Sequence, residues 1–254
     1  MPWKWVFMEV LMENLTREEF AKLLEKVQAV IIPVGSHEQH GPHLPFKHDI
    51  ASALFIAKEV ARRLYPRVLV APPVAVGLSP HHMRWPGTLT LKTETFVKVL
   101  VDLCESLSKH GVKRVVILNG HAGNYHTGFV EGAEGAPIDL AIMRARSFGL
   151  KVTGASYWDL IPPSIFHDIL KIDRDAGHAG EFETSVGLYI YPELVRFDRA
   201  GRAEGISGGA DMASSEKGRM IVEEAINGAI AFVEDFIQDK IEDVHYHRPF
   251  PPPQ

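Results

Sequence analysis

The sequence contains one cysteine and no cluster of basic residues. A single thiol, Cys104, excludes an intrachain disulfide framework, and its apolar neighbours at helical spacing predict that it is an inert part of the core. The formal net charge is −5, and Lys and Arg form no stripe along the chain. Binding to nucleic acid or to an anionic membrane surface is therefore not expected.

Long hydrophobic runs are also missing. No apolar stretch approaches the ~20 residues that a membrane span needs. In the N-terminal MPWKWVFMEV, Lys4 and Glu9 bracket a very short apolar run with no small-residue cleavage site after it, so no signal peptide is expected. The chain lacks an internal repeat and the G-x-G-x-x-G and G-K-[ST] patterns of nucleotide-binding loops. A cytoplasmic, reducing location is the expectation.

Strand-like apolar runs alternate with helical segments along the 254 residues, of which 46% are hydrophobic. Thr16 and Glu19 have the spacing of a capping box that opens a helix. Pro72 and Pro73 are expected to divide a strand or place it at a sheet edge. The predicted strands are 29–35, 68–77, 112–120, 139–145 and 151–157, and the predicted helices are 16–27, 50–64, 93–110, a segment after Asn124, one from about 180, and 215–240. This alternation predicts a single α/β domain over 1–254, a three-layer αβα sandwich with a mostly parallel sheet and an extended C-terminal tail.

Polar residues gather in three stretches, two of which directly follow predicted strands. They are SHEQHGPHLPFKHD (36–49), NGHAGN (119–124) and DAGHAGEFETS (175–185). In open α/β sheets, binding sites form beyond the carboxyl ends of the strands. The three stretches are therefore expected to converge in space.

Glu38, His40, Asp49 and His121 are the candidate metal ligands in these stretches. A spacing of two in an extended segment places Glu38 and His40 on the same side. Two imidazoles and two carboxylates suit Zn²⁺, Mn²⁺ or Fe²⁺, and an aspartate such as Asp49 can bridge two ions. The competing interpretation treats Asp49 as a helix N-cap and the histidines as solvated loop residues. The clustering favours a metal site.

Five further histidines near these stretches have less specific patterns. His37, His43 and His48 do not fit the Glu-x-His spacing. They are expected either to contact the metal ligands without binding the metal or to lie on the surface. His81 and His82 occupy a loop that is expected to face the same cleft. We take His82 as a candidate substrate contact.

These motifs resemble the signature of the creatininase (creatinine amidohydrolase) family. GSHEQHGPHLPFKHD is similar to its Glu-Gln-His-Gly-Pro-His-Leu-Pro run before an aspartate, and LSPHHMRWPGTLTL to its Ser-x-x-His-x-x-Phe-Pro-Gly-Thr segment, with Trp85 at the phenylalanine position. NGHAGN resembles its Asn-Gly-His-Gly-Gly-Asn turn, and HAGEFETS its His-Ala-Gly-x-x-Glu-Thr-Ser element. The matches follow the expected order from about residue 29 to 190.

The resemblance implies a hydrolase with two divalent metal ions per subunit, acting on amide-type C–N bonds of a small molecule. Glu38, Asp49 and His121 match ligands of one ion, and His40 with the shared Asp49 matches ligands of the other. His178 matches the proton-transfer histidine of the family. The resemblance also implies a homohexamer, since family members are typically trimers of dimers.

One departure from the family concerns the second metal. Creatininase has a metal-ligating glutamate two residues after the histidine of the Asn-Gly-His turn, where this chain has Gly123. Glu183 is the expected replacement, and Glu181 is its rival. The alternative is that Glu183 is only a carboxylate at a helix start, interacting with the helix dipole.

A second departure concerns the substrate. Creatininase has a tryptophan just before the aspartate matched by Asp175, a candidate catalytic residue, and this chain has Arg174 there. The other substrate-packing tryptophan is matched by Trp158. A guanidinium in place of one aromatic wall points away from creatinine and toward an anionic or more polar substrate.

The function favoured by these residues is hydrolysis of an amide or formamide by a metal-bound hydroxide, with His178 carrying a proton to the leaving nitrogen. Formamide hydrolases that act on a phosphorylated pyrimidine ribotide, in flavin and deazaflavin precursor synthesis, are one option within the family. Creatinine hydrolysis and a peptidase that trims a cofactor precursor are others. The alternative of another class is a metal-binding or nucleotide-binding module without catalysis.

Overall fold

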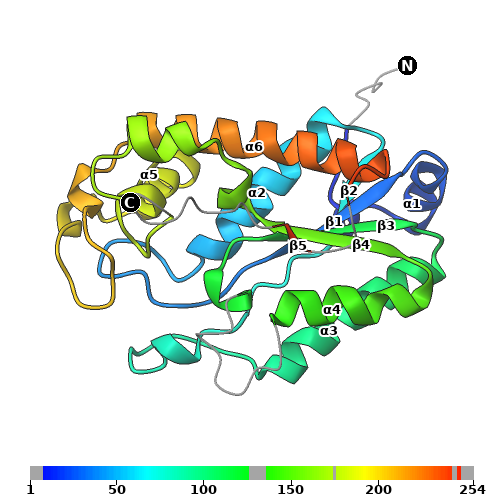
Figure 1. Ribbon diagram of the computed structural model, residues 1–254, viewed down its shortest axis with the longest axis horizontal. Coiled ribbons are helices and arrows are strands. Elements are labelled where there is room, and N and C mark those ends of the chain that lie inside the picture. The colour runs from blue at the N-terminus through cyan, green and yellow to red at the C-terminus, as the bar shows by residue number, and fades with distance from the viewer. Residues whose placement is uncertain (1–7, 126–135, 174–175, 242–244, 247–254) are drawn as a thin grey trace.

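A parallel five-stranded sheet forms the centre of the computed structural model, which describes residues 8–125, 136–173, 176–241 and 245–246. The strand order is β2-β1-β3-β4-β5, and every neighbouring pair is parallel (Figure 1). The strands are β1 (Ala29–Val34), β2 (Val68–Val70), β3 (Arg114–Asn119), β4 (Lys151–Ser156) and β5 (His245–Tyr246). The prediction of a mostly parallel α/β sheet is confirmed.

Helices cover both faces of the sheet, so the fold has three layers (Figure 1). On one face, α2, α5 and α6 pack against side chains such as Ile31 and Leu118. On the other face, α3 and α4 pack against Ile32 and Ile117, which are adjacent to Ile31 and Leu118 in the same strands. Successive strand residues point to opposite faces, and both faces are buried, as expected for parallel strands between helices. The helices are α1 (Arg17–Leu24), α2 (His48–Arg63), α3 (Thr93–Lys109), α4 (Pro137–Ala145), α5 (Glu181–Ile190) and α6 (Ser215–Ile237).

Several local predictions are confirmed. The capping box is present, with Glu19 N donating to Thr16 Oγ1 at 3.3 Å and the Glu19 side chain accepting from Thr16 N. Cys104 is buried, with 1% of its surface exposed. β2 ends before Pro72 and lies at a sheet edge. Within the described ranges, no helix has the length and apolar character needed to cross a membrane.

The predicted strand at 139–145 is wrong, because these residues belong to helix α4. Pro137 occupies the first turn, where its fixed φ suits a helix and its missing N–H costs nothing. Ile138, Ala141, Ile142 and Ala145 are buried on one face at helical spacing. The apolar run in this segment is short enough to fit either a strand or a helix. The proline before it was the signal in favour of a helix. The helix predicted after Asn124 lies largely outside the described residues. In the tail, only His245 and Tyr246 are described, and they are extended.

The strand ends place the polar loops at one edge of the sheet. Val34 pairs with Asn119, and Asn119 pairs with Ser156, so β1, β3 and β4 end side by side. The start of α2 lies directly against two of these ends: a Cβ on Gly35 would be 2.4 Å from Ile50 N, and a Cβ on Gly120 would be 2.3 Å from Asp49 O. Glycine at these positions therefore lets the first turn of α2 approach the loops after β1 and β3.

Candidate metal centre

The five predicted metal ligands come together as a buried cluster. Glu38 and His40 lie in the loop after β1, Asp49 in the first turn of α2, His121 after β3, and Glu183 in the first turn of α5. Their exposed fractions range from 1% to 7%. Buried charged groups of this density need partners or a metal, because isolated burial of each charge is strongly unfavourable.

Asp49 lies between two imidazole rings. Its Oδ1 is 2.9 Å from His40 Nε2, and its Oδ2 is 3.1 Å from His121 Nδ1. The N-cap interpretation is wrong, because Lys47 is the N-cap residue of α2 and makes no side-chain cap. Each carboxylate oxygen instead faces a different histidine, which is the arrangement that a bridging carboxylate requires.

Glu38 faces His121 from the other side of that ring. Glu38 Oε2 is 3.3 Å from His121 Nε2 and accepts a hydrogen bond from Ser79 Oγ at 2.5 Å. Asn119, at the end of β3, fixes the backbone of His121: Asn119 Nδ2 donates to His121 O, and His121 N donates to Asn119 Oδ1. The positions of both ligands are thus set by neighbouring polar side chains.

Glu183 points into the cluster, and Glu181 does not. Glu183 Oε2 lies 3.5 Å from His40 Nε2. Glu181 is paired with Lys217 and accepts hydrogen bonds from the backbone N–H groups of Lys171 and Ile172, each at 2.7 Å. The geometry therefore separates the two rivals: Glu183 lies beside His40, where a ligand is predicted, whereas Glu181 is engaged in other contacts.

The surroundings of Gly123 fit the same conclusion. A Cβ at this position would lie 2.3 Å from Leu78 O and 2.4 Å from His121 Nε2. A glutamate therefore has no room at position 123 unless His121 or the Leu78 backbone moves. The carboxylate of Glu183, on α5, lies in the cluster, as the prediction of a replacement ligand requires.

Three buried atoms in the cluster form no hydrogen bond of good geometry among the described residues, namely His40 Nε2, Asp49 Oδ2 and His48 Nε2, although His40 Nε2 and Asp49 Oδ1 form an ion pair at 2.9 Å. His40 Nδ1 donates to Glu38 O at 3.1 Å, so Nε2 is the nitrogen that becomes available to a metal ion when the ring loses its second proton. The candidate ligand atoms of Glu38, His40 and Asp49 lie within 4.8 Å of one another, as do those of His40, His178 and Glu183. The residues present therefore fit a centre for divalent metal ions.

The electrostatics show how strongly these ligands interact in the metal-free chain. Burial opposes the charged form of His40, yet Asp49 and Glu183 raise its pKa to about 10. Burial alone would raise the pKa of Glu38, but the charge of His121 lowers it to about 2. Burial raises the pKa of Glu183 to about 8. At neutral pH, His40 and Glu183 therefore hold protons that a metal ion must displace.

Metal binding is accordingly expected to release protons. We predict more than one proton released per chain at pH 7, and an apparent affinity that rises with pH up to about 10, most steeply below about 8, because protons compete for His40 and Glu183 below their pKa values. Titration calorimetry in two non-coordinating buffers with different ionisation enthalpies measures the release. A binding heat independent of the buffer would contradict this expectation.

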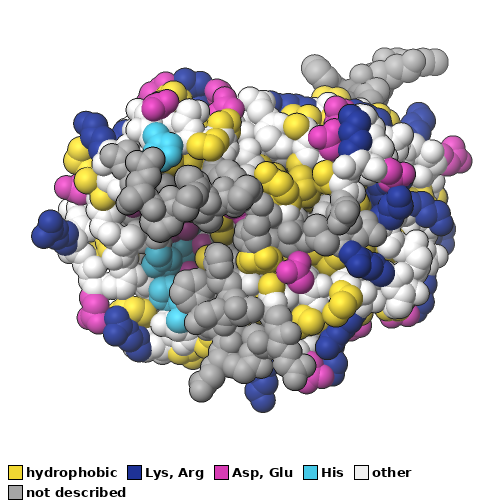
Figure 2. Space-filling model, in the orientation of Figure 1, with side chains coloured by type: hydrophobic (Ala, Val, Ile, Leu, Met, Phe, Trp, Pro, Cys, Tyr) yellow, Lys and Arg dark blue, Asp and Glu magenta, His cyan; other side chains and the backbone are white. Residues whose placement is uncertain are grey.

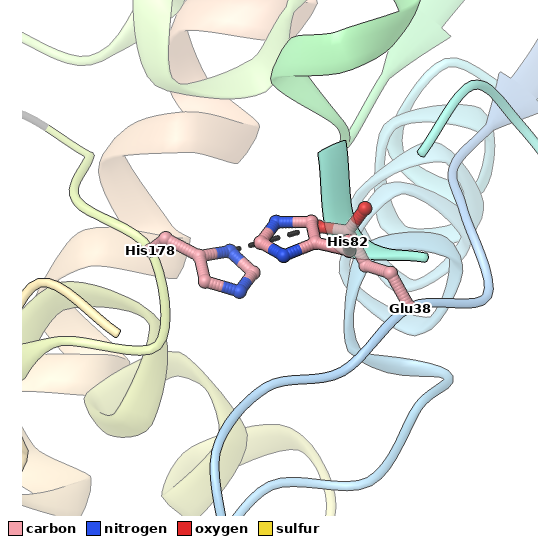
Figure 3. Close-up of side chains that lie close together, drawn as sticks. All are labelled: Glu38, His82 and His178. Carbon is pink, nitrogen blue, oxygen red and sulfur yellow. Dashed lines mark ion pairs between the residues drawn. The ribbon is translucent and has the colours of Figure 1, made fainter. Parts of the chain in front are cut away.

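His82 and His178 stack beside Glu38, with ring centroids 4.4 Å apart (Figure 3). Glu38 Oε1 is 3.5 Å from His82 Nε2 and 3.6 Å from His178 Nδ1. Burial, together with the charge of His40, lowers the pKa of His178 to about 3, so its imidazole is neutral at pH 7. The prediction that His178 lies at the centre is thus supported by its position, and His82 lies there with it.

Gln39 contacts both of these rings. Its Oε1 accepts from Gly41 N, and its Nε2 donates to Gly205 O at 2.6 Å and to His82 Nδ1 at 3.1 Å. His82 therefore presents Nε2–H to Glu38. His178 Nε2 lies 2.9 Å from Gln39 O and 3.0 Å from Gln39 Nε2, so Gln39 holds this ring in place beside Glu38.

Comparison with known proteins agrees with this site. The family model named Creatininase, described as creatinine amidohydrolase, matches residues 13–205. The chain belongs to the creatininase family. As a member, it is an amidohydrolase, and the resemblance found in the sequence motifs is confirmed.

Relatives within the creatininase family include creatinine amidohydrolase of Pseudomonas putida, 31% identical over 89% of this chain and 97% of that protein. The mycofactocin precursor peptide peptidase of Mycolicibacterium smegmatis is 34% identical over 82% of this chain and 85% of that protein. A solved structure of creatininase with manganese matches at a TM-score of 0.77 and 28% identity, over 90% of this chain and 99% of that chain. A zinc–zinc form of a creatininase variant matches at 0.76 and 29%, over 90% and 98%.

The remaining predicted histidines have mixed outcomes. His43 and His48 are fully buried, so a surface position is wrong for both. His48 lies behind Glu183, with Nε2 3.9 Å from Glu183 Oε1, while its Nδ1 bonds to the hydroxyl of Tyr191. His81 stacks on His121 with a centroid distance of 5.9 Å. In the space-filling view, histidine side chains gather over the half of the molecule that holds α5 (Figure 2).

Of Trp158, Arg174 and Asp175, the structure describes only Trp158. Trp158 is buried against Tyr157, with ring centroids 5.1 Å apart, in the core beside α6. Its contact with substrate stays a prediction. Arg174 and Asp175 lie outside the described residues.

Two residues that contact the candidate ligands and histidines at this centre were not identified from the sequence. Gln39 and Ser79 both stand inside the quoted motifs, next to predicted ligands or substrate contacts, but they carry no charge and give no metal-ligand pattern. Polar residues inside a motif were the available signal.

Proposed function

We propose that this chain is a metal-dependent amidohydrolase that cleaves the C–N bond of an amide or formamide in a small polar molecule. The observation that carries this proposal is the buried cluster of imidazoles and carboxylates: the candidate ligand atoms of Glu38, His40 and Asp49 lie within 4.8 Å of one another, and Glu183 Oε2 lies 3.5 Å from His40 Nε2. So many buried ionisable groups in one place are costly in a folded protein, and a bound metal ion offsets that cost.

Two ions per subunit are proposed, one held by Glu38, Asp49 and His121, the other by His40, Asp49 and Glu183. Zinc, manganese and iron all suit these nitrogen and oxygen donors. Bound there, the ions would supply Lewis acidity that polarises a carbonyl and lowers the pKa of a water. The creatininase structures with Mn and with Zn are consistent with this choice.

The protein groups would handle the proton. The neutral His178 has one ring nitrogen without hydrogen and lies beside Glu38, so it can accept a proton from water and deliver it to the leaving nitrogen. His82 presents Nε2–H beside the same carboxylate oxygen and can donate a hydrogen bond to substrate. Gln39 contacts both rings and holds them in place. Burial of the ligands limits the access of bulk water.

A hydrolysis screen on metal-reconstituted protein tests the proposal. Its substrates are creatinine, formamidopyrimidine nucleotides, simple formamides and short peptides. We expect metal-dependent release of the amine from at least one amide, and a loss of about 10²-fold in kcat in His178→Ala with metal content unchanged. His110→Ala, an exposed histidine at the end of α3, is the matched control. Metal-loaded protein that hydrolyses none of these compounds would contradict the proposal.

Peptide cleavage is the second candidate. It is favoured by the 34% identity to a peptide peptidase over 82% of this chain. The peptide arm of the screen separates it from action on non-peptide amides.

A further inference from the structure

A cavity of about 510 Å³ opens directly beside the metal centre. His40, a candidate metal ligand, and Gln39 are among the residues that line it. Phe46 and Trp85 form aromatic walls, and Arg196 and Glu204 contribute charged groups. A group bound in this cavity would therefore lie next to a substrate amide held at the metal ions.

Two glycines with positive φ hold the aromatic walls in place. Gly87 has φ +95°, and a Cβ there would be 2.4 Å from Phe46 Cζ. Gly205 has φ +80°, and a Cβ there would be 2.4 Å from Trp85 Cζ2. Each ring packs directly on glycine backbone, which no other residue type would permit without strain. Packing against the glycine backbone therefore fixes the positions of both aromatic rings.

The charges around the cavity do not cancel. Glu204 is paired with Arg84 at 2.9 Å, and the Arg84 guanidinium also lies 4.0 Å from the Trp85 ring centroid. Arg196 has no carboxylate partner in the part of the chain that the structure describes. Its Nη1 donates to Leu194 O at 2.6 Å, which leaves other guanidinium N–H groups for a ligand. The cavity therefore combines apolar walls with one unpaired positive charge.

Backbone contacts join this cavity to the catalytic histidines. Gly205, which supports Trp85, accepts the hydrogen bond from Gln39 Nε2 at 2.6 Å. Arg196 N donates to His43 O at 2.9 Å, so Arg196 is anchored to the same loop that carries His40. These contacts fix the Trp85 ring and the backbone of Arg196 relative to the loop that carries Gln39 and His40.

We propose that this cavity is the subsite for the part of the substrate beyond the scissile amide, and that it binds a flat apolar group carrying an anion, with the anion on Arg196. The inference rests on the proposed function and narrows its substrate class. A guanidinium pairs equally with a carboxylate or a phosphate, and aromatic walls suit a planar ring. Creatinine, which is small and carries no such anion, would leave the cavity unused.

Binding of simple probes to the metal-loaded protein tests the subsite without requiring turnover. The probes are benzoate, phenyl phosphate and benzyl alcohol, which share a ring and differ in charge. The readout is the indole N–H signal of Trp85 in ¹⁵N NMR spectra, assigned with Trp85→Phe. We expect at least one anionic probe to shift this signal with an affinity about tenfold tighter than that of benzyl alcohol. The two anions compared with each other show whether carboxylate or phosphate is preferred.

The variants decide whether Arg196 is responsible. Arg196→Ala should reduce the anion's affinity to that of benzyl alcohol, whereas Arg199→Ala, an exposed arginine three residues away, should leave it unchanged. Equal affinity for all three probes would overturn the inference. So would an affinity unaffected by Arg196→Ala, as expected if the anion binds the metal ions, or no shift of Trp85, as expected if a second copy of the chain covers the cavity.

The two proposals can fail separately. A protein that binds an anionic probe through Arg196 but hydrolyses no amide would overturn the proposed function and support the subsite. A protein that hydrolyses amides with a KM indifferent to Arg196 would overturn only the subsite.

Discussion

Asp49→Ala should abolish amide hydrolysis, with a loss of at least about 10³-fold in kcat/KM. Asp49 lies between His40 and His121, the two imidazoles assigned to different ions, with one carboxylate oxygen facing each. Its removal takes a ligand from both ions at once. Lewis-acid stabilisation of several kcal/mol is then lost, and each 1.4 kcal/mol corresponds to a factor of ten.

Metal content and fold are measured on the same samples. Elemental analysis should find less than one equivalent of metal per Asp49→Ala chain, while far-UV circular dichroism remains native, because Asp49 lies at a helix start beside a loop and not in the apolar core. Asp49→Asn keeps the volume and removes only the charge. Asp102→Ala, an exposed aspartate in α3, should retain metal and rate. Full activity in Asp49→Ala would exclude a bridging role.

Glu183→Gln and Glu181→Gln should give opposite results, although the two residues are two positions apart on α5. Glu183→Gln is expected to lose one of two metal equivalents and roughly 10³-fold in rate, because the second ion would keep only His40 and a shared Asp49. Glu181→Gln should keep both ions and the rate. It should instead lower the free energy of unfolding by about 3 kcal/mol, because it breaks a buried pair with Lys217.

Metal analysis and thermal unfolding distinguish the two variants. Glu181→Gln should melt roughly 10 °C below the parent protein, which follows from that free energy for a chain of this size. Glu183→Gln should melt close to the parent when both are metal-free. If Glu183→Gln retains two equivalents and the parent rate, the second ion has a ligand other than the one assigned here.

The approximate site followed from the sequence because parallel strands end at one edge of a sheet. The loops after 29–34 and 114–119 had to meet there, and Val34 and Asn119 are indeed paired. The family motifs then named the ligand candidates. The choice between Glu181 and Glu183 also needed the folded chain, because only the Lys217 contact from α6 shows that Glu181 is already satisfied.

Other features depended on tertiary contacts that no local pattern reports. His48 is hydrogen-bonded to Tyr191, more than a hundred positions later, and its loop context alone left both a supporting and a surface position open. The cavity forms because Gly205 lies under Trp85, two residues with no relation in the sequence. α4 was misassigned because its apolar run is short enough to match a strand, and its packing against α3 settles the period.

The most direct test of the account is anomalous X-ray diffraction from crystals of the metal-loaded protein, collected at the absorption edge of the bound metal. The account predicts two peaks in each subunit. One lies among Glu38, Asp49 and His121, and the other among His40, Asp49 and Glu183. A single peak, or peaks that Asp49 does not contact, would contradict it.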